Sequence, residues 1–197
     1  MTFLKLMVAV ALAAAVAACV TVTNPATREQ VLTYRLTRVD VVYAGDAKIW
    51  WGDGEREFAA TKGVAAHNAE SVANTPEGQA YLRGAISHKL EAAFERALAP
   101  YLVGERPVRL QVVVKGVRIS SVIQRIVIGG NHAIAADINL VDAKTGEVLI
   151  AFAGQGASVP AGQGIVGTMV DHALMAAPID RVIDNMAITY KNWLLKI

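Results

Sequence analysis

The chain has 197 residues, of which 54% are hydrophobic and 18% are charged, and its mean hydropathy of +0.38 suggests a membrane protein. The composition excludes a disordered acidic or basic tail, because such tails are charge-rich and poor in apolar residues. The formal net charge of +2, with basic residues scattered along the chain, excludes a nucleic-acid footprint.

The first 18 residues have the pattern of an export signal. Lys5 precedes an unbroken apolar run of 13 residues, 6–18. A transmembrane helix needs roughly 20 such residues, whereas a run of this length is typical of a secretory signal peptide. The run ends in the small residues Ala17 and Ala18, which favour cleavage after Ala18. An ordinary secretory signal with an incidental cysteine, or a short membrane anchor, are the alternatives.

The segment Val16-Ala-Ala-Cys19 resembles the lipobox of bacterial lipoproteins. In that family the cysteine thiol is joined to diacylglycerol, the chain is cut before it, and the new amine is acylated. Cys19 is the only cysteine, so a disulfide cannot account for it, and we expect it to carry the lipid with no other cofactor. Residue 20 is Val rather than the Asp of inner-membrane retention, so the resemblance implies the outer membrane, facing the periplasm.

The mature chain opens with a polar stretch and a strand. Residues 19–30 predict a tether, and residues 31–43 alternate as a strand does. Residues 44–74 are less regular. Here a short strand at 48–51 and a turn at 52–54 are expected, and the remainder predicts a loop.

The next element is a long helix. Thr75-Pro76-Glu77 combines an N-cap hydroxyl, a first-turn proline and an acid, and apolar residues follow with a period of 3.6 as far as Tyr101. Residues 108–119 then predict a strand, 120–128 a strand or loop, and 132–141 another alternating strand.

A hairpin and a last helix complete the chain. Residues 142–146 (DAKTG) predict a tight turn with Gly146 left-handed, and 147–153 return as the partner strand. A Gly/Ser/Pro stretch at 154–167 and a helical turn near 168–177 lead to a helix that begins near Pro178. Residues 31–197 therefore predict a single α+β domain: a two-layer sandwich in which a mostly antiparallel sheet of about four strands is covered by two amphipathic helices.

No pattern of catalytic or metal-binding residues stands out. We therefore expect neither catalytic activity nor a bound metal. Residues 162–167 match G-x-G-x-x-G, but no βαβ unit can follow them in the remaining residues. The four histidines are widely spaced, and His88 with Glu91 fits a solvated helix face better than a metal site. Ser158 lacks the second glycine of a nucleophile elbow.

Two segments are candidate partner surfaces. Trp50 and Trp51 lie in an irregular stretch, where exposed aromatics favour interfaces, although burial under a loop is the alternative. Ile123 and Ile126 belong to an apolar segment that predicts either an open strand edge or an ordinary buried strand.

Several segments together carry a further resemblance: Ile49-Trp-Trp-Gly-Asp53, Arg106-Pro-Val108, Ile128-Gly-Gly-Asn-His132 and Asp142-Ala-Lys-Thr-Gly-Glu-Val148. Over residues 31–155 the chain resembles small Gram-negative lipoproteins known only as domains of unknown function. More distantly it is similar to auxiliary lipoproteins of envelope transport systems, which are non-catalytic. We therefore expect a membrane-anchored envelope component with a protein partner. The alternative is a small-ligand-binding protein or hydrolase with a site under residues 44–74.

Overall fold

The structure is a computed structural model that describes residues 23–121, 131–160 and 176–197. Its elements follow one another as α2 (Arg28–Leu32), β1 (Tyr34–Trp51), α3 (Gly52–Thr61), the 3-10 turn η1 (Ala66–Asn68), α4 (Ala69–Ala73), α5 (Pro76–Leu98), β2 (Arg106–Ile119), β3 (Asn131–Asp142), β4 (Val148–Pro160) and α8 (Pro178–Leu195).

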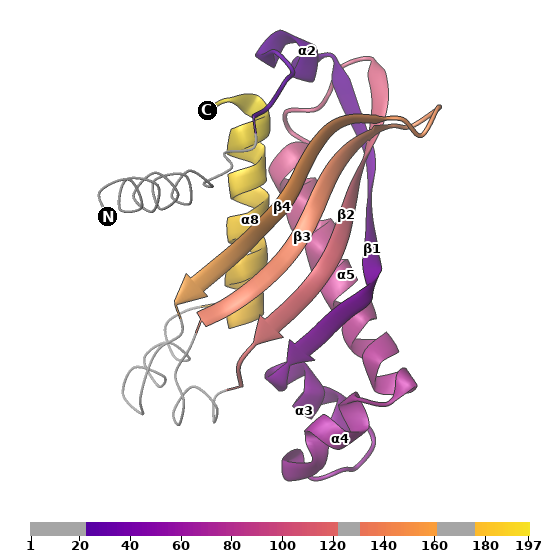
Figure 1. Cartoon of the computed structure of the whole chain (residues 1–197), viewed down its shortest axis with the longest axis vertical. Helices are drawn as coiled ribbons and strands as arrows, with labels where there is room; N and C mark the ends of the chain where they lie inside the picture. Colours follow the sequence, from indigo (N-terminus) through magenta and orange to yellow (C-terminus); the bar gives the residue numbers. More distant parts are fainter. Residues whose placement is uncertain (1–22, 122–130, 161–175) are drawn as a thin grey trace, which may run out of the picture.

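The strands form one mixed four-stranded sheet in the order β1-β2-β3-β4. β1 pairs with β2 in parallel, whereas β2, β3 and β4 form antiparallel pairs. α5 and α8 lie together on one face of this sheet (Figure 1). The predicted two-layer α+β sandwich is confirmed. Its single parallel pair exists because α3, α4 and α5 return the chain along the sheet before β2 begins.

The core lies between the sheet and the two long helices. On β2 every second side chain from Val108 to Val114 is fully buried against the helices, as the two-residue period of a strand requires. α8 contributes Tyr190, which is fully buried and stacks edge-on against Phe94 of α5 and Phe152 of β4 at centroid distances of 5.9 and 5.5 Å. Burial raises the pKa of the Tyr190 hydroxyl, because the interior disfavours the phenolate.

α5 begins where the sequence predicts. Thr75 is the N-cap and its hydroxyl accepts a hydrogen bond from the Gly78 N–H at 3.2 Å, while Pro76 occupies the first turn. The apolar stripe of the helix is buried at Leu82, Ile86 and Leu90. Local capping and periodicity therefore fix this element.

The N-terminal segment differs from the prediction. Instead of a tether to residue 30 and a strand from residue 31, residues Arg28–Leu32 form the short helix α2, capped by a reciprocal pair of hydrogen bonds between Thr27 and Gln30. Asn24 is also buried, and its amide donates to the main-chain carbonyls of Trp193 and Leu194 in the last turn of α8, at 3.2 and 2.9 Å. These tertiary hydrogen bonds satisfy carbonyls that a helix leaves unpaired at its end.

The segment expected to be a loop is also different. β1 continues without a loop to Trp51, and residues 52–61 are helical rather than a turn. The glycines of this stretch serve close packing: a Cβ at Gly52 would lie 2.5 Å from the Ser121 side chain, and one at Gly54 would overlap the Trp51 ring. Glycine as a turn signal misled the prediction here, because close approach requires the same residue.

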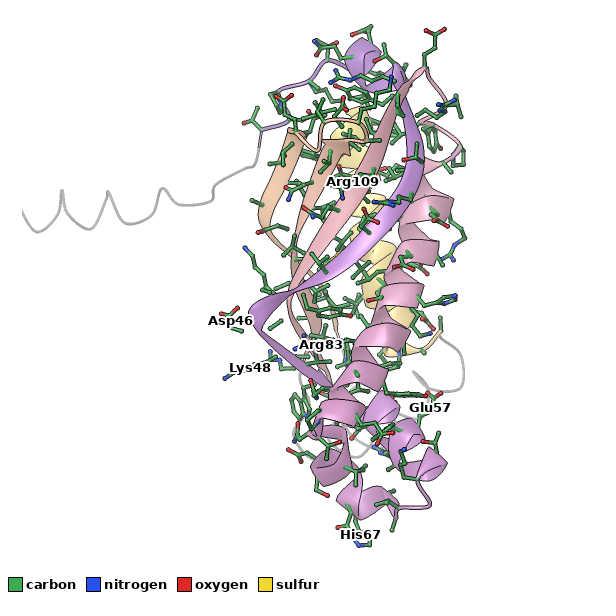
Figure 2. All side chains as sticks on the ribbon, turned by 90° about the vertical axis from the view of Figure 1, so that its right-hand side faces the viewer. Asp46, Lys48, Glu57, His67, Arg83 and Arg109 are labelled. Carbon is green, nitrogen blue, oxygen red and sulfur yellow. The ribbon has the colours of Figure 1, made fainter. Side chains whose placement is uncertain are left out.

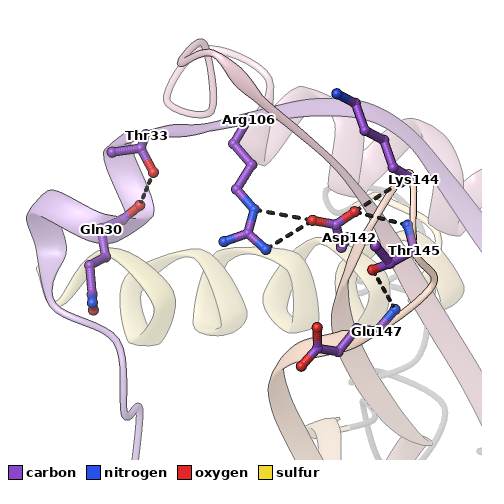
Figure 3. Close-up of polar contacts among 7 residues, drawn as sticks. All are labelled: Gln30, Thr33, Arg106, Asp142, Lys144, Thr145 and Glu147. Carbon is purple, nitrogen blue, oxygen red and sulfur yellow. Dashed lines mark hydrogen bonds and ion pairs between the residues drawn. The ribbon is translucent and has the colours of Figure 1, made fainter.

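The β3–β4 hairpin is confirmed. Asp142 accepts hydrogen bonds from the N–H groups of Lys144 and Thr145 at 2.9 and 3.0 Å and pairs with the Arg106 guanidinium at 2.9 Å (Figure 3). Gly146 has φ of 78°, the left-handed conformation expected of it. The Thr145 hydroxyl accepts from the Glu147 N–H at 3.3 Å and closes the turn.

The molecule is elongated and has two distinct ends (Figure 1). We call one the α2 end; it comprises α2, the turn between α5 and β2, the β3–β4 hairpin and the last turn of α8. We call the other the α4 end; it comprises α3, η1 and α4. α5, with 23 residues, runs between them and is about 35 Å long at 1.5 Å per residue.

Candidate functional site

A small cavity of about 180 Å³ lies at the α4 end. Its walls carry four titratable side chains on α3, η1 and α4, and Ser121, just after β2, closes it. The lining comprises Gly52, Glu55, Arg56, Ala66, His67, Ala69, Glu70 and Ser121. His67 lies at the tip of the molecule, far from α2 (Figure 2). Apart from Ser121, the lining residues belong to the first part of the connection between the parallel strands β1 and β2.

Close main-chain packing positions these walls. A Cβ at Gly78 would lie 2.5 Å from the carbonyl oxygen of Val72, so only glycine allows α4 to rest on the first turn of α5. Lys62 and Glu77 form an ion pair at 2.5 Å that joins the end of α3 to α5. The Tyr81 hydroxyl donates to Glu57 at 2.9 Å and joins the same two helices. α3 and α4, which carry the cavity, are therefore fixed to the start of α5.

Glu55 is the buried carboxyl group of the cavity. It is only 6% exposed, and one carboxylate oxygen accepts a hydrogen bond from the Trp51 N–H at 3.2 Å. Burial raises the pKa of Glu55, with a smaller contribution from the Glu70 carboxylate, while the Trp51 hydrogen bond opposes the rise. The side chain is therefore easier to protonate than an ordinary glutamate.

The cavity brings acidic and basic side chains together around a small volume. A buried carboxyl, an imidazole, a guanidinium and a second carboxylate surround the cavity, so it can offer either charge to a small polar ligand. Within the described residues, no three histidine, cysteine, aspartate or glutamate side chains converge as metal ligands. Sequence reasoning placed the alternative site in residues 44–74, but it singled out none of these side chains, because an acid in a first helical turn has no distinctive spacing.

The residues predicted from the sequence fall into three groups. Trp51 packs in the core at 6% exposure, because it follows the inward side of β1. Trp50 points to the other face, is half-buried and lies beside Arg118 in the register of β1 and β2. Ala18, Cys19, Ile123 and Ile126, together with the glycine motif at 162–167, lie outside the described residues.

Two further histidines, His88 and His132, lie outside the cavity of the α4 end. His88 lines a cavity of about 230 Å³ between α5 and α8, where Lys89 pairs with Asp180 at 2.7 Å and Arg96 with Asp184 at 2.9 Å. These two ion pairs link α5 to α8. His132 is fully buried and its Nδ1 accepts from the Ser120 N–H at 3.2 Å, which is a structural role at the base of β3.

Neither a protein-family model nor a curated protein matches the sequence. Among solved structures, a "putative lipoprotein" from Caulobacter crescentus CB15 is 17% identical, with a TM-score of 0.37, over 56% of this chain and 81% of that one. A PelC dodecamer from Paraburkholderia phytofirmans is 13% identical, with a TM-score of 0.34, over 84% of this chain and 92% of that one. Similarity at this level supports no conclusion about function, which has to come from this chain's own residues.

Proposed function

We propose that this chain is a bacterial envelope lipoprotein, anchored through Cys19 in the outer membrane and facing the periplasm, and that it acts as a non-catalytic binding or assembly component. The observation that carries the proposal is the sole cysteine of the chain, placed directly after an apolar run and two alanines. One acyl chain binds a membrane weakly, but several hold a protein firmly.

Two structural features support the proposal. None of the helices in the described part of the chain combines the length and apolar character needed to cross a bilayer. Asn24, only five positions after Cys19, is already fixed to α8 by two hydrogen bonds. The folded domain therefore begins close to Cys19, with α3 and α4 at the opposite extremity of the molecule (Figure 1).

The test is the fate of the Cys19→Ala variant. We expect the wild-type protein to sediment with outer membranes, to resist extraction by high salt, and to show an acylated N-terminal peptide by mass spectrometry. The Cys19→Ala variant should carry no acyl group and should no longer sediment with outer membranes. The Val20→Asp variant is the matched control, because it keeps the lipid but should move the protein to the inner membrane. A Cys19→Ala variant that still sediments with outer membranes at high salt would show that the anchor is assigned wrongly.

A second candidate function is a carrier of small polar ligands. The observation that favours it is the buried carboxyl of Glu55 in the cavity of the α4 end. Ligand-detected NMR with a set of small amines and amides should show binding to the wild-type domain and weaker binding to the Glu55→Gln variant. Equal binding to both would remove this cavity as a site.

A further inference from the structure

The α2 end carries an unusual share of the exposed apolar side chains. The large hydrophobic residues that are exposed in the described chain number seven, and five of them belong to the segments of this end: Leu32, Tyr101, Val103, Val148 and Ile197. The other two, Val42 and Ile188, lie partway along β1 and α8. Exposed apolar side chains are ordinary singly, but several at one place mark an interaction site.

The segments that carry these side chains are held together by the main chain. The Gly104 N–H donates to the carbonyl of Tyr34 at 2.9 Å, and the Arg106 N–H to that of Thr33 at 3.0 Å. Val103 is 71% exposed although its main chain bridges to Arg35 at the start of β1. Its side chain is therefore displayed by a fixed turn next to α2.

The chain enters the described fold at the same end. Asn24 is fixed to the last turn of α8, and five residues span at most about 17 Å when fully extended. A lipid on Cys19 therefore keeps the α2 end within that distance of the anchoring residue. α5 alone is about twice as long as this reach, so the tether brings the α2 end to the membrane surface.

We infer that the apolar surface of the α2 end, defined by Leu32, Tyr101, Val103, Val148 and Ile197, rests on the lipid bilayer into which Cys19 is anchored. This inference depends on the lipid anchor of the proposed function. It fixes the orientation of the domain: β1 and α5 stand away from the membrane and present the α4 end to the periplasm. Side chains that sit at such an interface bury about 5–10 Å into the headgroup region.

Charge has a minor part in this contact. The charged side chains on the same segments are of both signs, and they comprise Arg28, Glu29, Arg35, Glu105, Arg106, Asp142, Lys144, Glu147, Lys191 and Lys196. The Lys191 ammonium lies 5.6 Å from the Tyr101 ring centroid, so one cation already covers part of the apolar surface. We therefore expect the contact to depend little on anionic lipid, in contrast to a polybasic patch.

The sole cysteine offers a direct experiment. Because lipidation blocks the Cys19 thiol, a cysteine introduced elsewhere is the one free thiol of the full lipidated chain. Val103→Cys and Leu32→Cys test the α2 end, and Ile188→Cys and His67→Cys are exposed controls on α8 and at the α4 end. Each variant is labelled with a nitroxide and reconstituted in vesicles of phosphatidylethanolamine and phosphatidylglycerol.

Relaxation by a water-soluble nickel reagent should be roughly fivefold weaker at the two α2-end labels than at the controls, because headgroups exclude the reagent. Equal relaxation at all four positions would overturn the inference. Protection in whole envelopes without protection in pure vesicles would also overturn it, and would assign the surface to a protein. Mass spectrometry of the same samples separates the two hypotheses: a missing acyl group overturns the proposed function, whereas acylated protein with equal relaxation overturns only the orientation.

Discussion

The two ends of the molecule shift the pKa of a carboxyl group in opposite directions. At the α2 end, hydrogen bonds from the Thr145 N–H, the Arg106 guanidinium and the Lys144 N–H lower the pKa of Asp142 from 3.8 to about 2. At the α4 end, burial raises the pKa of Glu55. The first carboxylate closes a hairpin and stabilises the fold when it is ionised. The ionised form of the second, held in a cavity, lowers the stability of the fold. Such groups are common at ligand-binding sites.

The largest expected effect tests how tightly the α2 end is built. A Cβ at Gly104 would overlap the main-chain carbonyl of Thr33, so Gly104→Ala forces the turn after α5 away from β1 and should cost about 2–3 kcal/mol. Gly84→Ala is the matched control, because it lies in α5 with open space around it and should stabilise by about 0.5–1 kcal/mol. Urea unfolding of both variants measures the difference, and equal midpoints would show that this end is loosely packed.

A smaller effect is expected where the chain enters the fold. Asn24→Ala removes the amide that donates to the carbonyls of Trp193 and Leu194 and should cost about 1–2 kcal/mol, because each carbonyl loses a hydrogen bond at a position largely shielded from water. Thr189→Ala, on an exposed part of α8, is the control. Hydrogen exchange should quicken in the last turn of α8 in the Asn24 variant alone. Unchanged exchange would mean that the N-terminal segment does not hold the helix end.

A third test uses the acid stability of the hairpin. Because the pKa of Asp142 is lowered to about 2, its contribution to stability is fully present above about pH 4 and is lost as the pH falls toward 2. Asp142→Asn should lower stability near neutral pH and flatten the pH dependence of urea unfolding between about pH 4 and 2. If the variant and the wild type have parallel profiles over that range, the hydrogen bonds of Figure 3 do not hold the ionised form.

The smallest expected change in stability is a gain, and it concerns the replacement of Glu55. Its raised pKa means that ionisation opposes folding as the pH rises through and above the unfolded value of about 4.5. Glu55→Gln keeps an acceptor for the Trp51 N–H and should unfold at a slightly higher urea concentration at pH 7. This gain should vanish below pH 4. A variant that is less stable at neutral pH would show that the ionised carboxylate supports α3 rather than opposing it.

The sequence by itself determined the local elements whose signals are short-range. The cap at Thr75, the left-handed Gly146 and the alternation of residues 132–141 each predicted an observed element, because capping, turn chemistry and periodicity act between near neighbours. The pattern around Cys19 likewise depends on adjacent residues and remains the basis of the proposed anchor.

Tertiary structure decided the rest. Gly52 and Gly104 look like turn signals, but Gly52 packs against Ser121 and Gly104 against the main chain of Thr33, and these partners lie about 70 residues away in the sequence. The same is true of Asn24, which lies in a polar stretch and is fixed by carbonyls about 170 residues away. The parallel pairing of β1 and β2, the burial of Glu55 and the apolar surface of the α2 end all arise from such long-range contacts, because packing brings together residues whose spacing in the chain carries no period.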